Sequence, residues 1–197
     1  MSIALQKELD ALVHDVLGTD YVNYLGTRLS VEEDFIADRV RINCEIKNGD
    51  KLVIEGVGVG VVDALFSGLI QRISIDHPSL KSLMFVDFSV KSDVTTKTGL
   101  AGSDSKAHVE LTVENNRNRR FTFSHSSRSV THSSVAVTLQ AISYFINSEK
   151  AFLKVRAALE HAKTENRYDS VERYKTMLAQ LVENTSYDEA ISKTKQE

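Results

Sequence analysis

The sequence has a single cysteine among its 197 residues, so no disulfide bond can form within the chain. This residue, Cys44, lies in a segment whose side chains alternate between apolar and polar from Val40 to Lys47. Such alternation predicts a strand with one buried face, and Cys44 falls on that face. We therefore interpret Cys44 as a buried structural thiol, which fits a reducing, cytoplasmic setting.

Charge and hydropathy exclude two further classes of protein. The net charge is −3, whereas nucleic-acid-binding domains are usually basic, so no nucleic-acid partner is expected. No segment has the roughly 18 consecutive apolar residues that a membrane-spanning helix needs. The N-terminal residues also lack the basic start and apolar run of a signal peptide. We expect a cytoplasmic protein without membrane contact.

Proline is as rare as cysteine, and the single one, Pro78, lies in a loop after a set of predicted elements. Residues 39–58 read as two strands joined by Asn48-Gly49, which is the strongest short signal for a β-hairpin. Residues 61–74 follow as a helix with one apolar face.

The same order of elements returns in the second half of the chain. A long strand from Leu80 precedes a second hairpin, which turns at residues 115–118, and a helix over residues 130–147. An internal duplication is the simplest account of the two similar halves. The expected fold class is α/β (α+β), with two βββα units related by pseudo-twofold symmetry and with N- and C-terminal helical extensions.

Both extensions are predicted from helical periodicity. The first 17 residues carry an apolar stripe, and a second short helix is expected from Ser30 to Ile36, where Ser30 and Glu33 form a capping box. Beyond Ser148 the chain reads as helical, with a helix that starts at Asp169 as N-cap and a frayed polar tail after Asn184. The expected domains are residues 1–38, 39–150 and 151–197.

The stretch from Glu55 to Leu69 reads EGVGVGVVDALFSGL, in which three glycines alternate with valine before a helix begins. Glycines at such a place can let the backbone approach an anion at the free N–H groups of the helix start. A dinucleotide fingerprint needs Gly-x-Gly-x-x-Gly and a P-loop needs Gly-Lys-Ser/Thr, and neither spacing is present. The remaining alternative is that the glycines permit a bulge or a tight turn.

A longer motif around this loop resembles a known family. Residues 56–65, GVGVGVVDAL, resemble the G-x-G-N-G-P-V-D-A-L pattern of the regulatory domain of 2-isopropylmalate synthases and citramalate synthases. The resemblance covers about residues 39–150, through the strand at 87–90, the segment 102–104 and the helix that ends at 144–147. The family's Asn and Pro in the glycine loop are Val59 and Val61 here.

This resemblance implies two βββα units that dimerise and bind a small amino acid or 2-oxo acid, without a cofactor or a metal. We expect such a ligand between the glycine loop with its helix start, which offers unpaired N–H groups to a carboxylate, and the loop after residue 102. An aspartate of either segment would pair with a ligand ammonium, although the one at the helix start also favours the helix dipole. The implied ligand-binding residues are Gly58, Val59, Gly60, Val61, Asp63, Ala64, Gly102 and Asp104.

Synthases of this family also carry a catalytic barrel of about 250 residues, with a metal-binding His-x-His motif. This sequence has neither, so we expect a regulatory domain that stands alone and is not an enzyme. Its expected partners are a second copy of itself and a catalytic synthase subunit. The alternative is an interaction or structural module that has kept the fold and lost the ligand.

Two polar segments are candidates for other chemistry. His125 and His132 lie among serines, but a nucleophilic Ser/His pair needs an orienting acid, and a metal site needs more ligands at a recognised spacing. We interpret them as solvated or capping residues. Arg117, Arg119 and Arg120 lie at the tip of the second hairpin, which we interpret as a solvated, charged turn rather than a phosphate site.

Overall fold

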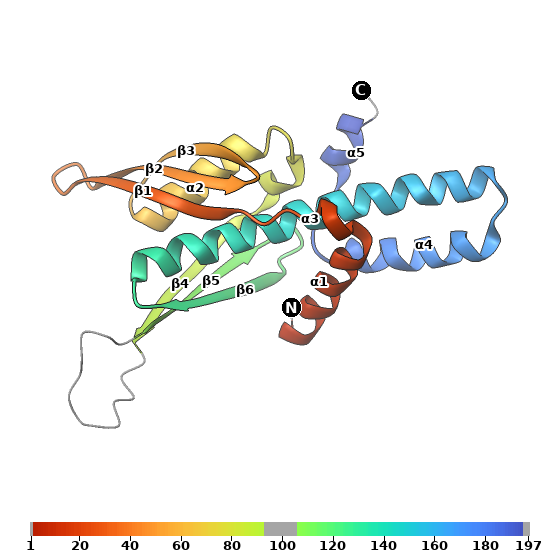
Figure 1. Ribbon diagram of the computed structural model, residues 1–197, viewed down its shortest axis with the longest axis horizontal. Coiled ribbons are helices and arrows are strands. Elements are labelled where there is room, and N and C mark those ends of the chain that lie inside the picture. The colour runs from red at the N-terminus through yellow and green to blue at the C-terminus, as the bar shows by residue number, and fades with distance from the viewer. Residues whose placement is uncertain (1, 93–105, 195–197) are drawn as a thin grey trace.

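The computed structural model describes residues 2–92 and 106–194, which form a layered body with a projecting pair of helices (Figure 1). Two short 3₁₀ helices, Gly18–Asp20 and Pro78–Ser82, join larger elements. The larger elements, in chain order, are α1 (Ile3–Leu17), β1 (Leu25–Asp34), β2 (Arg39–Asn48), β3 (Asp50–Gly58), α2 (Val61–Ile73), β4 (Met84–Ser92), β5 (Ala107–Glu114), β6 (Arg120–Ser127), α3 (Val130–Thr164), α4 (Tyr168–Leu181) and α5 (Asp188–Thr194).

The strands form two three-stranded antiparallel sheets, β1-β2-β3 and β4-β5-β6, and a helix follows each sheet. The predicted pair of βββα units is therefore confirmed. The first strands of the two units even share a register shift near their start, between Gly26 and Arg28 in β1 and between Phe85 and Asp87 in β4. A bulge bends its strand and increases its twist, so the two sheets are deformed at equivalent places.

Both predicted hairpins are present, and each turn contains a residue with a positive φ. Gly49 follows Asn48 with a φ of 82°, which glycine adopts without steric cost. Asn118 has a φ of 56° in the turn between β5 and β6. Asparagine is among the few other residues that tolerate this conformation, so the polar turn sequences fix where the strands reverse.

Alternation along β2 places Cys44 in the core, as predicted. Its neighbours on the same face, Val40, Ile42 and Ile46, are buried, whereas the residues on the other face are exposed or, at Glu45, partly exposed. Burial, followed by the nearby Glu45 charge, raises the pKa of the Cys44 thiol to about 11. The thiol therefore stays protonated at neutral pH, which suits a packing role.

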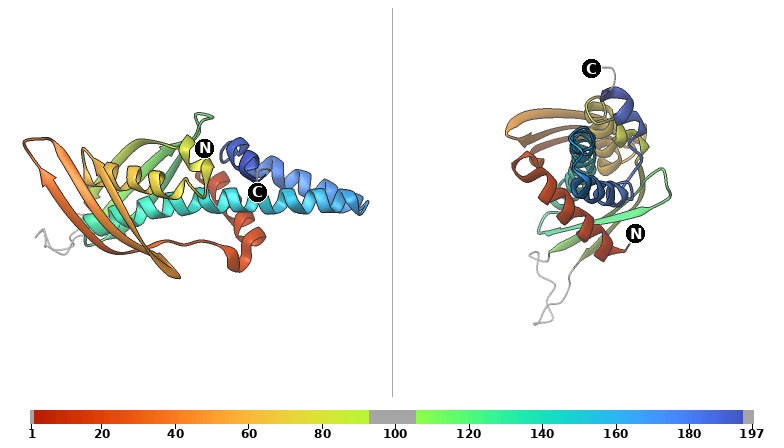
Figure 2. Two further views of the ribbon diagram at one scale, coloured as in Figure 1. Left: turned by 90° about the horizontal axis from the view of Figure 1, so that it is seen from above. Right: turned by 90° about the vertical axis from the view of Figure 1, so that its right-hand side faces the viewer.

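The helices α2 and α3 connect the two units through one continuous core (Figure 2). The helix α2 packs on β2 and β3, and its Phe66 ring lies 6.0 Å from the Phe85 ring of β4 in the other sheet. The helix α3 packs on β5 and β6 and also reaches β1, where the Gly26 backbone lies against Val135. Because each helix contacts both sheets, neither unit has a complete core without the other.

Two glycines allow α2 to lie directly against β3. A Cβ atom added at Gly56 would lie closer than 3.0 Å to the carbonyl oxygen of Ala64, and one at Gly68 would be equally close to the carbonyl oxygen of Glu55. Real Cβ atoms do not approach other atoms so closely. The helix and the strand are therefore in backbone contact, which any larger residue at these positions would prevent.

The short helix predicted from Ser30 to Ile36 is wrong, because the segment up to Asp34 is strand β1. This strand pairs with β2 along its whole length, and most of its side chains are exposed. Ser30 and Glu33 therefore have the spacing of a capping box in the sequence, although both lie on an edge strand. The division of the chain into three domains stays a prediction.

Three boundaries in the second half differ from prediction. The strand expected from Leu80 begins only at Met84, because residues 78–82 form a 3₁₀ helix. The helix expected to end at residue 147 continues as α3 to Thr164, over a stretch without glycine or proline. The next helix, α4, begins at Tyr168 after Arg167, ahead of the predicted N-cap at Asp169.

Polar residues in the middle of α3 are buried and have hydrogen-bond partners. The Asn147 side chain accepts a hydrogen bond from the Val22 N–H (2.8 Å) and donates one to the Val22 carbonyl (2.7 Å). The Glu149 carboxylate accepts one from the Ser79 N–H (2.8 Å) and lies 3.0 Å from Nδ1 of His77. These contacts hold the segments before β1 and β4 against α3. Because the buried polar side chains have partners, α3 continues through this polar stretch.

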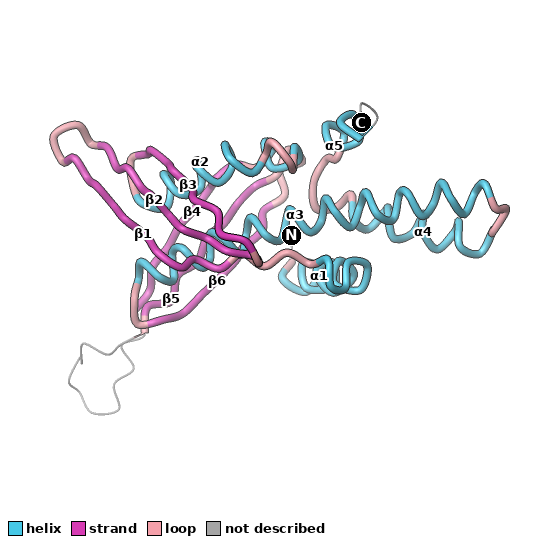
Figure 3. The backbone as a smooth tube through the Cα atoms, turned by 45° about the horizontal axis from the view of Figure 1, so that its top comes forward, coloured by secondary structure: helices cyan, strands magenta, loops and turns pink. Residues whose placement is uncertain are grey.

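A second apolar cluster holds the C-terminal part of the chain. The end of α3 and α4 form an antiparallel pair that projects from the body, with α1 packed at its base (Figure 3). The cluster contains Val13, Leu17, Ala151, Phe152, Val155, Leu181, Tyr187 and Ala190. The segment after Asn184 is therefore docked in part by buried side chains and contains α5, which corrects the prediction of a frayed tail.

The backbone contact between α2 and β3 predicts that Gly56→Ala destabilises the protein by about 1–3 kcal/mol, because the added methyl group must push the helix away. Gly60→Ser is the matched control. An added Cβ at Gly60 meets no atom within 4 Å, and serine is a favoured N-cap residue, so its free energy of unfolding should stay the same or rise slightly. Chemical denaturation measures both, and equal stability of the two variants would contradict the contact.

Candidate functional site

The glycine loop passes from the end of β3 into the first turn of α2. Gly60 is the N-cap of α2 in an extended conformation, with φ −157° and ψ 166°. The Val59 N–H donates a hydrogen bond of 3.1 Å to the Asp63 carboxylate, which reaches back from the first turn of the helix. This carboxylate therefore satisfies a loop amide, and its charge favours the positive end of the helix dipole.

The alternating glycines have two different roles. A Cβ atom at Gly58 would collide with the Asp63 carboxylate and with the Ala64 backbone, so Gly58, like Gly56, is required by packing. An added Cβ at Gly60 would meet open space. Both predicted roles are therefore present in one short segment. Gly58 permits close packing, and Gly60 leaves the loop open to an approaching group.

Most of the predicted ligand-binding residues lie together at this loop. Val59 is 72% exposed, and Val61 and Asp63 are partly exposed beside it. Ala64 is completely buried against β3, so its side chain faces the core rather than the loop surface. The two residues expected on the opposite wall, Gly102 and Asp104, lie outside the described residues.

A groove of about 630 Å³ lies beside the loop, between α2 and the first sheet. Its lining includes the charged residues Glu32, Arg41 and Glu55 and the polar residues Ser67 and Gln71 of α2. Sequence reasoning missed this groove, although Ser67 and Gln71 are four residues apart and hence lie on one helix face. Its charges of both signs suit a zwitterionic ligand.

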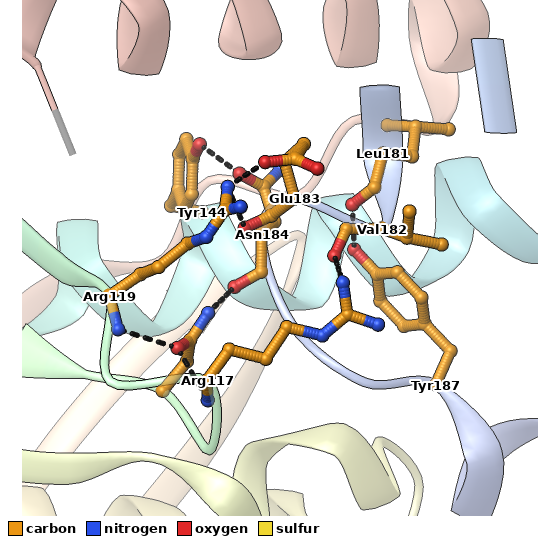
Figure 4. A network of polar contacts seen from close by, with 9 residues as sticks. Arg117, Arg119, Tyr144, Leu181, Val182, Glu183, Asn184 and Tyr187 are labelled. Atoms are coloured by element: carbon orange, nitrogen blue, oxygen red, sulfur yellow. Dashed lines mark hydrogen bonds and ion pairs between the residues drawn. The ribbon is translucent and has the colours of Figure 1, made fainter. Parts of the chain in front are cut away.

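The arginines of the second hairpin hold the chain segment that follows α4 (Figure 4). Arg117 donates a hydrogen bond of 2.8 Å from Nη1 to the Val182 carbonyl, and Arg119 pairs with the Glu183 carboxylate. Arg120 instead pairs with Glu114 on the neighbouring strand, at 2.8 Å. Most of the tip is exposed, as the interpretation of a solvated, charged turn expects, but Arg117 and Arg119 also connect it to a segment far away in sequence.

Asn184 lies at the centre of the same network, fully buried (Figure 4). Its side chain accepts a hydrogen bond from the Tyr144 hydroxyl (2.8 Å) and donates one to the Ser148 hydroxyl (2.9 Å). Its carbonyl accepts one from the Asn115 side chain (2.6 Å). No sequence signal marks this asparagine, since its partners come from two distant elements.

His125 of β6 and His132 in the first turn of α3 lie side by side, with ring centroids 5.3 Å apart. Nδ1 of His125 lies 3.2 Å from the hydroxyl of Ser133, which is fully buried and so offers no access to a substrate. Burial, together with the neighbouring His132, lowers the pKa of His125. Within residues 2–92 and 106–194, no three His, Cys, Asp or Glu side chains are grouped to hold a metal ion.

In the described part of the chain, none of the helices is both long enough and apolar enough to cross a membrane.

The buried network around Asn184 predicts that Asn184→Ala lowers the free energy of unfolding by about 1–3 kcal/mol, because the Tyr144 and Ser148 hydroxyls lose buried partners. Asn116→Ala is the matched control, since Asn116 is exposed, and it should change stability by less than about 0.5 kcal/mol. Thermal or urea unfolding compares the two. A neutral Asn184→Ala would mean that the C-terminal segment is not docked in this way.

Comparison with known proteins agrees with this architecture. No curated protein matches the chain in sequence. The family model described as the LeuA allosteric (dimerisation) domain matches residues 4–146, a range that includes both sheets, α2, the glycine loop and the first half of α3. The chain therefore belongs to the LeuA allosteric (dimerisation) domain family.

Proposed function

We propose that this chain is a non-catalytic regulatory module that self-associates and binds a small amino acid or a 2-oxo acid. The observation that carries the proposal is the family match over both βββα units. The module would act on the catalytic part of an isopropylmalate or citramalate synthase-like enzyme. The same hypothesis holds that the module acts as a separate subunit in the cytoplasm. Co-purification with a catalytic barrel would test the association between the two subunits.

The glycine loop is the proposed ligand site. The start of α2 offers backbone N–H groups and positive partial charge, which favour a ligand carboxylate. Gly60 leaves the approach open, and the exposed Val59 with Val61 offers apolar contact to a branched side chain. A ligand ammonium would pair with Asp63 or, as the sequence predicts, with Asp104, which lies outside the described residues.

One observation favours the alternative, an interaction module without a ligand. The Asp63 carboxylate already accepts the Val59 N–H, so the loop is closed by a contact of its own. An ammonium group would have to share this carboxylate. Ligand titration decides between the two functions.

Isothermal titration with leucine, isoleucine and their 2-oxo acids should show binding to the wild type. Binding should be lost in Gly60→Asp, because the new carboxylate would repel that of the ligand. Gly60→Asn is the matched control, since asparagine has nearly the same shape and caps a helix equally well but is neutral. Both variants should fold, because an added Cβ at residue 60 meets no atom within 4 Å.

Two results would overturn parts of this proposal. Equal binding by wild type and Gly60→Asp would place the ligand elsewhere, and Arg41→Ala would then test the neighbouring groove. Absence of binding at millimolar concentration would favour the interaction module.

The protein should not catalyse a condensation, because the matched family is a regulatory domain. Incubation with acetyl-CoA, a 2-oxo acid and a divalent metal should release no free CoA above a blank. A thiol reagent can measure this release directly, since Cys44 is buried and should give little background. Repeated turnover that increases with protein concentration would contradict the proposal.

A further inference from the structure

The strand β1 is a long edge strand with an open side. It pairs with β2 on one side, and no strand within residues 2–92 and 106–194 pairs with its other side. Nine of its ten residues are exposed, and only Leu29 is partly buried. Exposed edges of this length present free N–H and C=O groups and readily pair with another strand, so soluble proteins usually cover or interrupt them.

The same hairpin has exposed apolar side chains at its tip and at the start of β1. Phe35 and Ile36 at its tip are 86% and 99% exposed, and Leu25 at its start is 52% exposed. The tip projects beyond the helices that cover the rest of the sheet (Figure 3). Large apolar side chains gathered on one projecting element indicate a surface that another molecule covers.

The sequence of β1 is complementary to itself when it is read antiparallel. If Ser30 lies opposite the Ser30 of a second copy, each Arg28 lies opposite a Glu32, and each Leu29 lies opposite a Val31. One arrangement thus gives two charge pairs on one face and two apolar pairs on the other. Cross-strand pairs of these kinds stabilise antiparallel sheets.

Neighbouring registers are worse. If Leu29 were central, Arg28 would lie opposite Ser30 and Gly26 opposite Glu32, so no charge would be paired. If Val31 were central, each Arg28 would lie opposite an Asp34, but each Leu29 would lie opposite a Glu33. Among these three registers, only the one centred on Ser30 pairs the charges without placing an apolar side chain of β1 opposite a charged one.

This register also gives the exposed tip a place to bind. The twofold axis also carries the turn that follows Asp34 in one copy toward the start of β1 in the other, so Phe35 and Ile36 approach Tyr24 and Leu25 of the second copy. A cavity of about 470 Å³ opens there, lined by Tyr24, Leu25 and Gly26 together with Val135 and Leu139 of α3. The hairpin tip of each copy would thus cover the start of β1 in the other copy, and the twofold axis makes this contact twice.

We infer that two copies of this chain pair antiparallel through β1, centred on Ser30, and join their first sheets into one six-stranded sheet. The inference rests on the proposed self-association and adds its interface. Because every contact occurs twice about a twofold axis, the assembly closes as a dimer.

Charge exchange at the interface tests this pairing, with the dimer dissociation constant measured by analytical ultracentrifugation. Arg28→Glu alone and Glu32→Arg alone should each raise that constant by about tenfold or more, because two attractive contacts per dimer become repulsive. The double variant Arg28→Glu/Glu32→Arg should restore the wild-type constant, and so should an equal mixture of the two single variants. Arg173→Glu, which makes the same charge change on the exposed surface of α4, should have no effect.

The outcomes separate the two levels of the proposal. A wild type that stays monomeric at tens of micromolar would refute self-association itself. A wild-type dimer that all these variants leave unchanged, or that only Arg173→Glu weakens, would refute the β1 interface alone. Loss of dimer in the single variants without rescue in the double variant or the mixture would also refute the Ser30-centred register.

Discussion

The contact between α2 and β3 is the constraint on which the rest of the first unit depends. The helix backbone touches the strand backbone at Gly56 and Gly68, which brings Phe66 within reach of the second sheet. The same contact fixes where the glycine loop ends and where the helix N-terminus lies. Since α3 makes the equivalent connection from the second unit to β1, the two units stabilise each other through one shared core. A regulatory site at the loop would therefore be coupled mechanically to both sheets.

The length of α3 extends this coupling to the end of the chain. Its N-terminal half packs on the second sheet, and its buried centre holds the loops before β1 and β4 through Asn147 and Glu149. Its C-terminal half builds the apolar cluster with α1 and α4, and the hairpin arginines and Asn184 close the same region with polar contacts. The C-terminal segment is thus part of the folded body and not a detachable tail.

Local sequence patterns predicted those elements whose stabilisation is local. Alternation located β2 and Cys44, the Asn-Gly turn located the first hairpin, and helical periodicity located α2, because each pattern records a single buried face. The edge strand β1 lacks a buried face and therefore lacks the alternation that predicts a strand. The spacing of Ser30 and Glu33 led instead to the prediction of a capped helix. The middle of α3 contains polar residues whose partners are distant in sequence, so it looked like a helix end. At the loop, the motif located the candidate residues, but only packing distances distinguish Gly58, which the fold requires, from Gly60, which is free.

The chain is a member of the LeuA dimerisation domain family, and the proposed dimer pairs its edge strand β1 with the same strand of a second copy. Hydrogen–deuterium exchange at increasing protein concentration tests this most directly. If β1 pairs with its copy, amide exchange within residues 28–32 should slow as the concentration rises, while exchange in the central strands β2 and β5 stays the same. Exchange in residues 28–32 that does not depend on concentration, while another segment becomes protected as the protein associates, would contradict the account.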